Sequence, residues 1–370
     1  MQNIKVMQQA LDPTGYGGVS VEFRALKHSM LAGKYTFVPL IIREFHRGIS
    51  LRDILFYYRE IRIERPDIVQ IRGANVDGLN AVIAAKLAGN VKTMYCIHGL
   101  VSDNYYIKPW KKWIFRWIIE PMGFWLADGI SCVYGSCGKR DIFKLFQKKM
   151  LPYVYNRMPD YSSVDKEAER SLFRQKYGIR DDEIVAVFCS RMSREKGLDY
   201  YADAINLLRE HWPQKLKFVM VGDGDYLQAF QARLHPQISD CVIFTGSMQN
   251  VVPPLAAADF FVMPSLHENH SIALLEALAM KLPCIATDVG GNSETLADGR
   301  YGRLIPAFDS ELLALSITEM SEETVRTQYR KKIEQADFEK FSNGAVDSQL
   351  DSAYCSLLRN SRKRKESKNG

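Results

Sequence analysis

The stretch DFFVMPSLHENHSIALLEALAMKLPCIATDVGG, residues 259–291, decides the fold of this chain. It opens with a short apolar run, continues with a helical composition over residues 272–281, and ends in a second apolar run over 283–288. A strand, a helix and a second strand make a βαβ unit, whose two strands lie parallel in one sheet. Ser271 precedes the helix and is a favourable N-cap residue. The stretch predicts an α/β protein with a parallel sheet.

The same alternation of apolar runs and helical patterns extends over nearly the whole chain. The candidate strands cover residues 4–9, 36–41, 67–72, 92–97, 129–134, 184–190, 216–222, 241–246, 259–265 and 283–288. The polar stretch 158–170 between the two series contains a proline and a charge run but no strand pattern, which predicts two successive parallel sheets in two domains. We expect one Rossmann-like domain over 1–157 and another over 158–335. A helix over 336–358 should pack back on the first domain, before a basic disordered tail over 359–370.

Length and composition agree with two domains and exclude several classes of protein. The chain has 370 residues, more than the roughly 250–300 at which single cores stop growing. Hydrophobic residues make up 46% and charged residues 25%, which excludes extensive disorder. No apolar run approaches the ~20 residues of a spanning helix, and the first residues lack a secretion pattern, so we expect a cytoplasmic protein. The seven scattered cysteines indicate neither a disulfide framework nor a zinc site.

The net charge of +6 is a sum of unlike parts. Residues 1–157 contain 23 Lys and Arg against 12 Asp and Glu, residues 158–358 contain 20 against 30, and residues 359–370 contain 6 against 1. A basic half of this kind indicates an anionic surface or substrate. Nucleic acid is not the expected partner, because no basic sheet motif with interleaved aromatic residues is present.

Two basic amphipathic segments, 105–126 and 139–150, account for much of the charge of the first half. The first contains four of the five tryptophans, Trp110, Trp113, Trp117 and Trp125. Tryptophan with lysine and arginine is typical of a helix that lies on an anionic membrane surface. The alternative is that the apolar faces of both segments cover the parallel sheet.

Two glutamates of the stretch 259–291 are candidate ligand-binding residues. Glu276 has only apolar helical neighbours three and four positions away, and a buried carboxylate needs hydrogen-bond donors. The hydroxyls of a ligand such as a ribose would supply them; a structural arginine or a partly exposed position are the alternatives. Glu268 lies eight residues earlier, so the carboxylates should be on the order of 10 Å or more apart. That exceeds the ~5–9.5 Å of a glycosidase pair, so the two acids more plausibly hold different parts of one extended ligand.

The loop after the strand 184–190 supplies two candidate cations, Arg191 and Lys196. It lies at the carboxyl edge of the second sheet, where open α/β sheets bind ligands. Two cations there could neutralise a diphosphate; a solvated turn is the alternative. The nearby Asp223 and Asp225 are interpreted as a turn after a strand and not as metal ligands.

The first half offers two further candidates at the carboxyl edge of its sheet. His98 follows the strand 92–97 and could donate a hydrogen bond to a sugar hydroxyl, although a structural histidine fits equally. Gly15, Gly17 and Gly18 follow the first strand and would let the backbone approach a phosphate closely. Their spacing is not the dinucleotide fingerprint GxGxxG.

Taken together, the motifs of this chain resemble family 4 of the retaining glycosyltransferases, which have the GT-B fold. The resemblance covers about residues 4–358 and is specific through the order and spacing of its motifs. In the second half these are SRMSREKG, VGDG, FTGSMQNV, PSLHEN, LLEALA, LPCIATDVGG and Glu294; in the first half they are the Gly17-Gly18 loop, PDIVQIRG, His98-Gly99, ADGISCVYGS and Tyr155-Asn156. The resemblance implies two Rossmann-like domains facing a central cleft.

The resemblance also implies a role for each candidate residue. Glu276 would bind the ribose of a donor nucleotide, and Glu268 would lie near the donor sugar. Arg191 and Lys196 would hold the diphosphate, and His98 would contact the sugar. Gly17 and Gly18 would approach the donor phosphate and the acceptor, and the helix start would help to bind the donor through Asn269, His270, Ser271 and Ile272. No metal or other cofactor is implied.

This chain departs from the family pattern at several positions. Asn269 and His270 replace a frequent Gly-aromatic pair, Lys281 replaces a frequent glycine, and Gln70 and Arg72 stand where histidines are common. The departures concern the identity of the sugar more than the reaction class.

The sequence thus predicts a retaining glycosyltransferase. It would transfer a sugar from a nucleoside diphosphate, with UDP favoured, to a saccharide acceptor that is lipid-linked, at the inner face of the cell membrane in surface polysaccharide biosynthesis. Two alternatives remain at this stage: a nucleotide-sugar 2-epimerase of the same fold, which would convert the donor without an acceptor, and a membrane-associated sugar-nucleotide-binding protein without catalysis.

Overall fold

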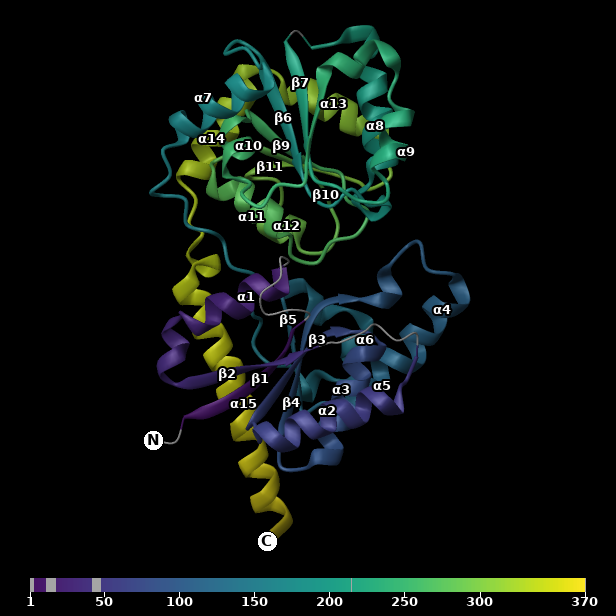
Figure 1. The fold of residues 1–370 in the computed structure, drawn as a ribbon, viewed down its shortest axis with the longest axis vertical. Helices are drawn as coiled ribbons and strands as arrows, with labels where there is room; N and C mark the ends of the chain where they lie inside the picture. The colour runs from purple at the N-terminus through teal and green to yellow at the C-terminus, as the bar shows by residue number, and fades with distance from the viewer. Residues whose placement is uncertain (1–2, 11–17, 42–47, 214, 370) are drawn as a thin grey trace. The chain divides into compact units, whose positions relative to one another are not determined.

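The protein folds into two compact units (Figure 1). The computed structural model describes residues 3–10, 18–41, 48–213 and 215–369, and of residues 10, 18–21 and 360–369 it describes the backbone alone. The first unit combines residues 1–157 with 339–370, and the second comprises residues 158–338. No helix within the described residues is both long and apolar enough to cross a membrane.

The first unit has a five-stranded parallel sheet in the order β2-β1-β3-β4-β5. Its strands are β1 (Ile4–Ala10), β2 (Tyr35–Ile41), β3 (Ile68–Ala74), β4 (Lys92–Leu100) and β5 (Gly129–Cys132). Its helices are α1 (Gly18–Lys27), α2 (Leu51–Glu64), α3 (Val76–Ala88), α4 (Pro109–Ile114), α5 (Glu120–Leu126), α6 (Asp141–Lys144) and α15 (Asn343–Asn369). Because β1 pairs with both β2 and β3, the strand order reverses between β1 and β3.

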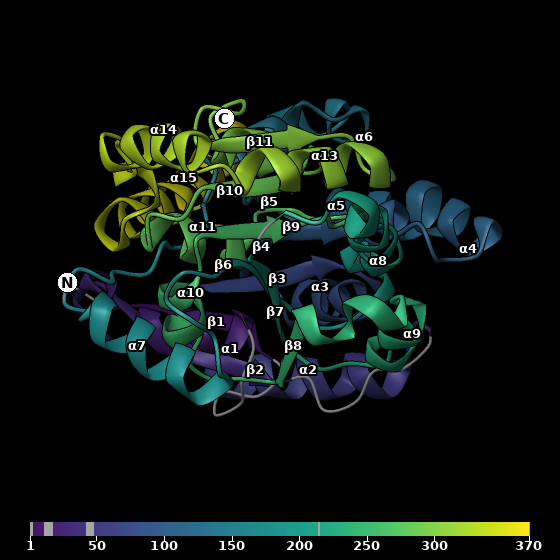
Figure 2. The ribbon, with the colours of Figure 1, turned by 90° about the horizontal axis from the view of Figure 1, so that it is seen from above.

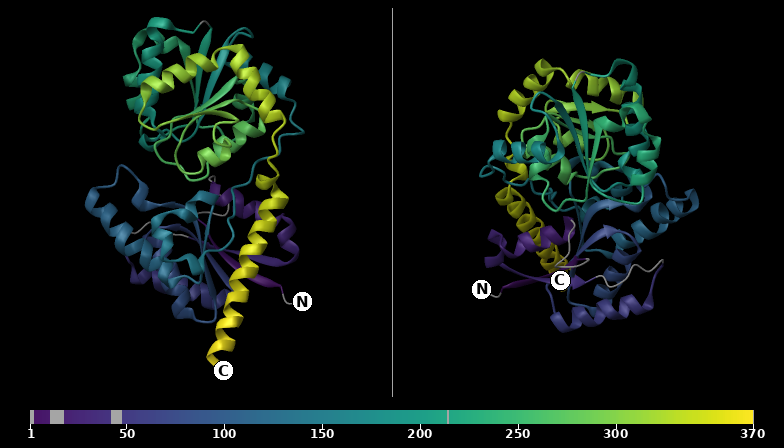
Figure 3. Two further views of the ribbon diagram at one scale, coloured as in Figure 1. Left: turned by 180° about the vertical axis from the view of Figure 1, so that it is seen from behind. Right: turned by 45° about the horizontal axis from the view of Figure 1, so that its top comes forward.

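The long helix α15 runs along the first unit (Figures 1 and 3). Its apolar positions are buried against the first sheet, in a cluster with residues of β1, α1 and β2: Val346, Leu350, Ala353, Tyr354 and Leu357. The helix continues as far as Asn369, whereas we expected disorder from residue 359. Arginine, lysine and glutamate favour helices, so a basic composition alone does not end one.

The second unit has a six-stranded parallel sheet in the order β11-β10-β9-β6-β7-β8. Its strands are β6 (Ile184–Cys189), β7 (Leu216–Val221), β8 (Val242–Gly246), β9 (Phe260–Met263), β10 (Cys284–Thr287) and β11 (Gly302–Ile305). Helices interleave with them: α7 (Lys166–Tyr177), α8 (Leu198–Leu207), α9 (Leu227–Arg233), α10 (Val252–Ala257), α11 (Ile272–Ala279), α12 (Asn292–Thr295), α13 (Ser310–Met320) and α14 (Glu323–Glu334).

Read from β8, this order is the doubly wound order 3-2-1-4-5-6 of Rossmann-type sheets. The helices lie on both faces of the sheet, over two separate apolar clusters (Figure 2). The edge strand β11, which is four residues long and contains Arg303, is not among the strands predicted from the sequence. Such a segment lacks the apolar run by which buried parallel strands are recognised.

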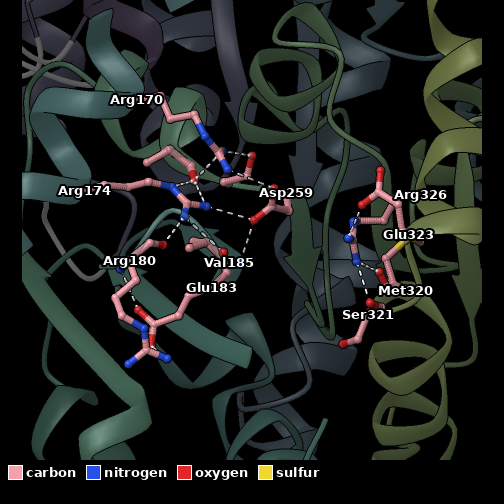
Figure 4. A network of polar contacts seen from close by, with 12 residues as sticks. Arg170, Arg174, Arg180, Glu183, Val185, Asp259, Met320, Ser321, Glu323 and Arg326 are labelled. Atoms are coloured by element: carbon pink, nitrogen blue, oxygen red, sulfur yellow. Dashed lines mark hydrogen bonds and ion pairs between the residues drawn. The ribbon is translucent and has the colours of Figure 1, made fainter. Parts of the chain in front are cut away.

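A buried arginine fastens α7 to the amino-terminal edge of the second sheet (Figure 4). The Arg174 side chain is 2% exposed and pairs with Asp259 at 3.0 Å. Its guanidinium also donates to three backbone carbonyls, those of Ala257, Arg180 and Glu183. Asp259 in turn accepts from the backbone N–H of Val185 at the start of β6. The Arg174 side chain therefore supplies hydrogen-bond donors to backbone carbonyls at the ends of several helices and strands.

We expect Arg174→Met to destabilise the second unit by roughly 3–5 kcal/mol, because it orphans buried carbonyls and removes one partner of a buried ion pair. Denaturation by urea, followed by circular dichroism, measures the change. Arg180→Met is the matched control, since that side chain is 67% exposed, and it should change stability little. Equal effects of the two substitutions would contradict the assignment.

Candidate active site

In the second sheet the strand order reverses between β6 and β9, and this position is a topological switch point. These two strands are neighbours in the sheet, and the chain leaves them toward α8 and α11, respectively. In open α/β sheets, ligands bind at the carboxyl ends of the strands at such a switch point. The loop 190–197 follows β6 and the loop 264–271 follows β9. These loops carry most of the predicted site residues.

Close backbone contacts hold the two loops together. Leu266 N donates to Glu195 O at 2.9 Å. Gly197 has φ +72°, and a Cβ at this position would lie 1.8 Å from Pro264 O, so only glycine fits. On the other side, a Cβ on Gly290 would lie 2.1 Å from Glu268 O. The loop after β9 is therefore clamped between the loops that follow β6 and β10.

An ion pair joins the predicted Lys196 and Glu268. Lys196 Nζ donates to Glu268 Oε1 at 2.6 Å, and the two side chains are largely buried. The same oxygen accepts a hydrogen bond from Ser265 Oγ at 2.9 Å. Both charged residues are predicted from the sequence to bind one ligand, and the structure brings them into direct contact. Ser265 is not among the predicted residues, and its only signal in the sequence is its place in the PSLHEN motif.

Arg191 lies in the same loop but points into solvent. Its side chain is 70% exposed and pairs with Glu195 at 2.8 Å. The neighbouring Asp223 forms a turn, as expected from its sequence, because its Oδ1 accepts from the N–H of Gly224. Within the described residues, no group of three or more His, Cys, Asp or Glu side chains could hold a metal ion.

The amino terminus of α11 opens at this edge of the sheet. Ser271 caps the helix, and its Oγ accepts from Leu274 N at 3.3 Å. Asn269 is half-buried, His270 is buried and Ile272 is exposed. The free N–H groups and the dipole of a helix start favour an anion such as a phosphate.

Glu276 is a half-buried residue of α11, and no hydrogen-bond donor or ion-pair partner for it is found among the residues that the structure describes. Burial raises its pKa to about 7, because a carboxylate loses solvation in an apolar surrounding. Its charge also helps to raise the pKa values of Tyr161 and Cys189, which places both residues nearby. Of the alternatives from the sequence, a structural arginine partner is absent from the described chain, whereas the partly exposed position agrees with the half-buried side chain.

The first unit has its own polar cluster where its strand order reverses. Arg72 at the end of β3 pairs with Glu22 of α1 at 2.9 Å, and both side chains are largely buried. Burial and the charge of Arg72 lower the pKa of His98 to about 4, so His98 is neutral at physiological pH. No described residue bonds His98 Nε2, which is buried. Gly18 begins α1, whereas Gly17 lies outside the described residues.

The tryptophan-rich segment of the first unit is exposed. Each of its four tryptophans, Trp110, Trp113, Trp117 and Trp125, has between 58% and 70% of its surface exposed. The segment is not one regular helix, because a π-helical turn, Phe115–Ile119, separates α4 from α5. Ser102 anchors it through hydrogen bonds to the buried carboxylate of Glu120, at 2.8 and 2.7 Å. The tryptophan side chains therefore do not cover the sheet, whereas Phe124 of α5 is buried in the core of the first unit, with Ile119, Met122 and Leu126 packed beside it.

The second basic segment, 139–150, differs from the amphipathic pattern expected of it. It is broken into α6 and short 3₁₀ turns, with Phe143 and Phe146 buried three residues apart. Several of its cations have structural roles: Arg140 pairs with Asp103, and Lys149 donates to carbonyls at the end of α5. Lys139 and Lys148 remain exposed.

Comparison with known proteins decides the class of the second unit. Residues 183–323 match the family described as glycosyl transferases group 1. This part of the chain is a group 1 glycosyltransferase domain. It contains Arg191, Lys196, Glu268 and Glu276, and the predicted enzyme class, glycosyltransferase, is confirmed.

Relatives and solved structures agree with the group 1 domain. The chain is 24% identical over 294 residues to the Escherichia coli UDP-Gal:alpha-D-GlcNAc-diphosphoundecaprenol alpha-1,3-galactosyltransferase, covering 78% of this chain and 75% of the relative. It is 27% identical over 205 residues to the Streptomyces kanamyceticus alpha-D-kanosaminyltransferase, covering 54% of this chain and only 53% of that relative. The Anabaena Alr3699/HepE structure in complex with UDP and glucose has a TM-score of 0.77 at 16% identity and covers 96% of this chain and 100% of that one. The predicted GT-B fold is confirmed.

The raised pKa of Glu276 makes the stability of the glycosyltransferase domain depend on pH. Since the pKa is near 7 in the folded state and about 4.5 in the unfolded chain, folding favours the protonated acid. Stability should fall as pH rises from about 4.5 through 7. We therefore expect Glu276→Gln to raise the melting temperature at pH 8 and to change it little at pH 4.5. Thermal denaturation at the two pH values tests this, and an equal shift at both would contradict a buried, unpaired carboxylate.

Proposed function

We propose that the protein is a metal-independent, retaining family 4 glycosyltransferase that uses a nucleoside diphosphate sugar, with UDP favoured. The Lys196–Glu268 pair at the start of α11 carries this proposal, because it puts a cation, a carboxylate and a helix dipole at one switch point. Known proteins of this fold support UDP as the nucleotide, since HepE was solved with UDP and with UDP-glucose.

In this proposal the second unit binds the donor from end to end. The ribose hydroxyls would donate to the Glu276 carboxylate and so supply the hydrogen-bond donors that this carboxylate lacks within the described protein. The diphosphate would lie against Arg191, Lys196 and the N–H groups that begin α11. As the bond from the sugar to the diphosphate breaks, negative charge grows on the phosphate oxygens. Preorganised cations and N–H groups stabilise that charge without a metal.

The sugar and the acceptor engage the remaining candidate residues. Glu268 would accept a hydrogen bond from the donor sugar, and His98 of the first unit would contact the same sugar. His98 acts there as a neutral hydrogen-bonding group, because burial and Arg72 hold its pKa well below neutrality. Gly17 and Gly18 would allow the backbone to approach the donor phosphate and the acceptor.

We infer that the acceptor is a lipid-linked saccharide and that the first unit meets the inner face of the cell membrane. The exposed tryptophans support this, because Trp110, Trp113 and Trp117 are spaced by three and four residues and lie beside Lys111, Lys112 and Arg116. The segment projects from the side of the first unit (Figures 1 and 2). The E. coli relative supports such an acceptor, since its name describes a diphosphoundecaprenol-linked sugar.

We expect Lys196→Ala to lower the rate of sugar transfer by roughly 100-fold or more, and Arg191→Ala to lower it too, because each removes charge that stabilises the leaving diphosphate. A thermal-shift screen with UDP, GDP, ADP and their sugars first identifies the donor. Release of the nucleoside diphosphate then measures the rate. Arg194→Ala, which removes an exposed cation from the same turn, should leave the rate unchanged. Intact rates in both site variants would refute the diphosphate assignment.

The membrane inference predicts co-sedimentation of the protein with vesicles that contain phosphatidylglycerol, and weaker co-sedimentation with pure phosphatidylcholine. Replacing Trp110, Trp113 and Trp117 together by alanine should weaken it strongly, since these side chains are three of the four exposed tryptophans of the segment. Leu172→Ala removes an equally exposed apolar side chain from the second unit and should change nothing. Binding that ignores both anionic lipid and the triple substitution would overturn the inference.

A further inference from the structure

Ser265 is a buried serine just beyond β9 whose hydroxyl contacts the site carboxylate. Its side chain has no exposed surface, and Oγ donates to Glu268 Oε1 at 2.9 Å. Lys196 Nζ donates to the same oxygen at 2.6 Å. One carboxylate oxygen therefore holds two donors, while no described residue donates to Glu268 Oε2.

The backbone around Ser265 is held on both sides, which sets the direction of its hydroxyl. Thr287 Oγ1 at the end of β10 donates to Ser265 O at 2.5 Å. The next residue, Leu266, donates its N–H to Glu195 O at 2.9 Å. Hydrogen bonds to the chain after β6 and at the end of β10 thus fix the backbone of Ser265. The Ser265 hydroxyl therefore donates to Glu268 from a fixed position.

We propose that Ser265 is a positioning residue that, together with Lys196, orients the Glu268 carboxylate so that Oε2 accepts a hydrogen bond from a hydroxyl of the donor sugar. This inference rests on the proposed function, which puts Glu268 beside that sugar. The terminal torsion of a glutamate is broad, so a carboxylate without such anchors would sample many orientations. Two donors on one oxygen remove this freedom before the ligand arrives, which is how preorganised sites gain affinity.

The proposal separates the effect of Ser265 from that of the nucleotide-binding residues. Arg191, Lys196 and Glu276 are assigned to the diphosphate and the ribose, which UDP and UDP-sugars share. Ser265 acts only on the carboxylate that faces the sugar. Its removal should therefore change the affinity for UDP-sugars and leave the affinity for UDP unchanged, a difference that a general loosening of the loop would not produce.

The test compares Ser265→Ala, Ser265→Cys and wild type by calorimetric titration with UDP, UDP-glucose, UDP-galactose and UDP-N-acetylglucosamine. We expect Ser265→Ala to bind UDP within about twofold of wild type and to lose about tenfold in affinity for the UDP-sugar that wild type binds best. Ser265→Cys keeps a weak donor of similar size and should lose less. Ser316→Ala, which removes an equally buried serine hydroxyl from α13, should match wild type for every ligand.

The outcomes distinguish this inference from the proposed function. Parallel losses for UDP and UDP-sugars, or no loss for either, would overturn the role of Ser265 and leave the nucleotide site standing. If wild type binds UDP and all three UDP-sugars with the same affinity, the role of Ser265 is overturned as well. If wild type binds none of the four ligands, UDP is refuted as the nucleotide. The proposed use of UDP-sugars and the role of Ser265 then both lose their basis. Thermal melts of each variant exclude unfolding, and Ser265→Cys carries the test if Ser265→Ala does not fold.

Discussion

The ion pair between Lys196 and Glu268 is the interaction on which the arrangement of the loops at the switch point of the second unit depends. It joins the loops that leave β6 and β9, two strands that are far apart in the sequence and adjacent in the sheet. This adjacency follows from the winding of the chain, which builds β7 and β8 on one side of β6 and then returns to the other side. The pair can form only because Gly197 and Gly290 let the neighbouring backbones come within contact.

The sheets of both units have a point at which the strand order reverses, but different side chains lie there. In the second unit the switch point presents a lysine, a carboxylate and a helix start, of which the carboxylate retains an oxygen without a donor. In the first unit the switch point is occupied by a largely buried Arg72–Glu22 pair. With the Gln8 amide turned so that its oxygen faces Arg72, this oxygen accepts from Arg72 Nε at 3.1 Å. The ion pair satisfies its own two charges, although His98 in the same cluster keeps a buried Nε2 that no described residue bonds. Polar atoms with an unmet hydrogen bond are the ones suited to a ligand.

Local patterns were enough to recognise most of the fold. Each predicted strand is found, because a buried parallel strand must be apolar on both faces and so leaves a continuous run in the sequence. The edge strand β11 escaped, since it is only four residues long and includes the partly exposed Arg303. The π-helical turn Phe115–Ile119 and the 3₁₀ turns on either side of α6 escaped as well. Residues outside these segments hold them, since Ser102 donates to Glu120 and Asp103 pairs with Arg140.

The sequence by itself determined the parallel α/β architecture, the contrast between a basic first half and an acidic second half, and the candidate charged residues. These follow from periodicity and residue type, which are local properties of the chain. Only the tertiary structure decided which of these residues meet. It paired Lys196 with Glu268, turned Arg191 toward Glu195 and exposed the tryptophans of the first unit. It also left Glu276 half-buried with a pKa near 7, and revealed the hydrogen bond from Ser265 to Glu268. Burial and hydrogen-bond geometry depend on residues remote in the chain, so no local pattern could carry them.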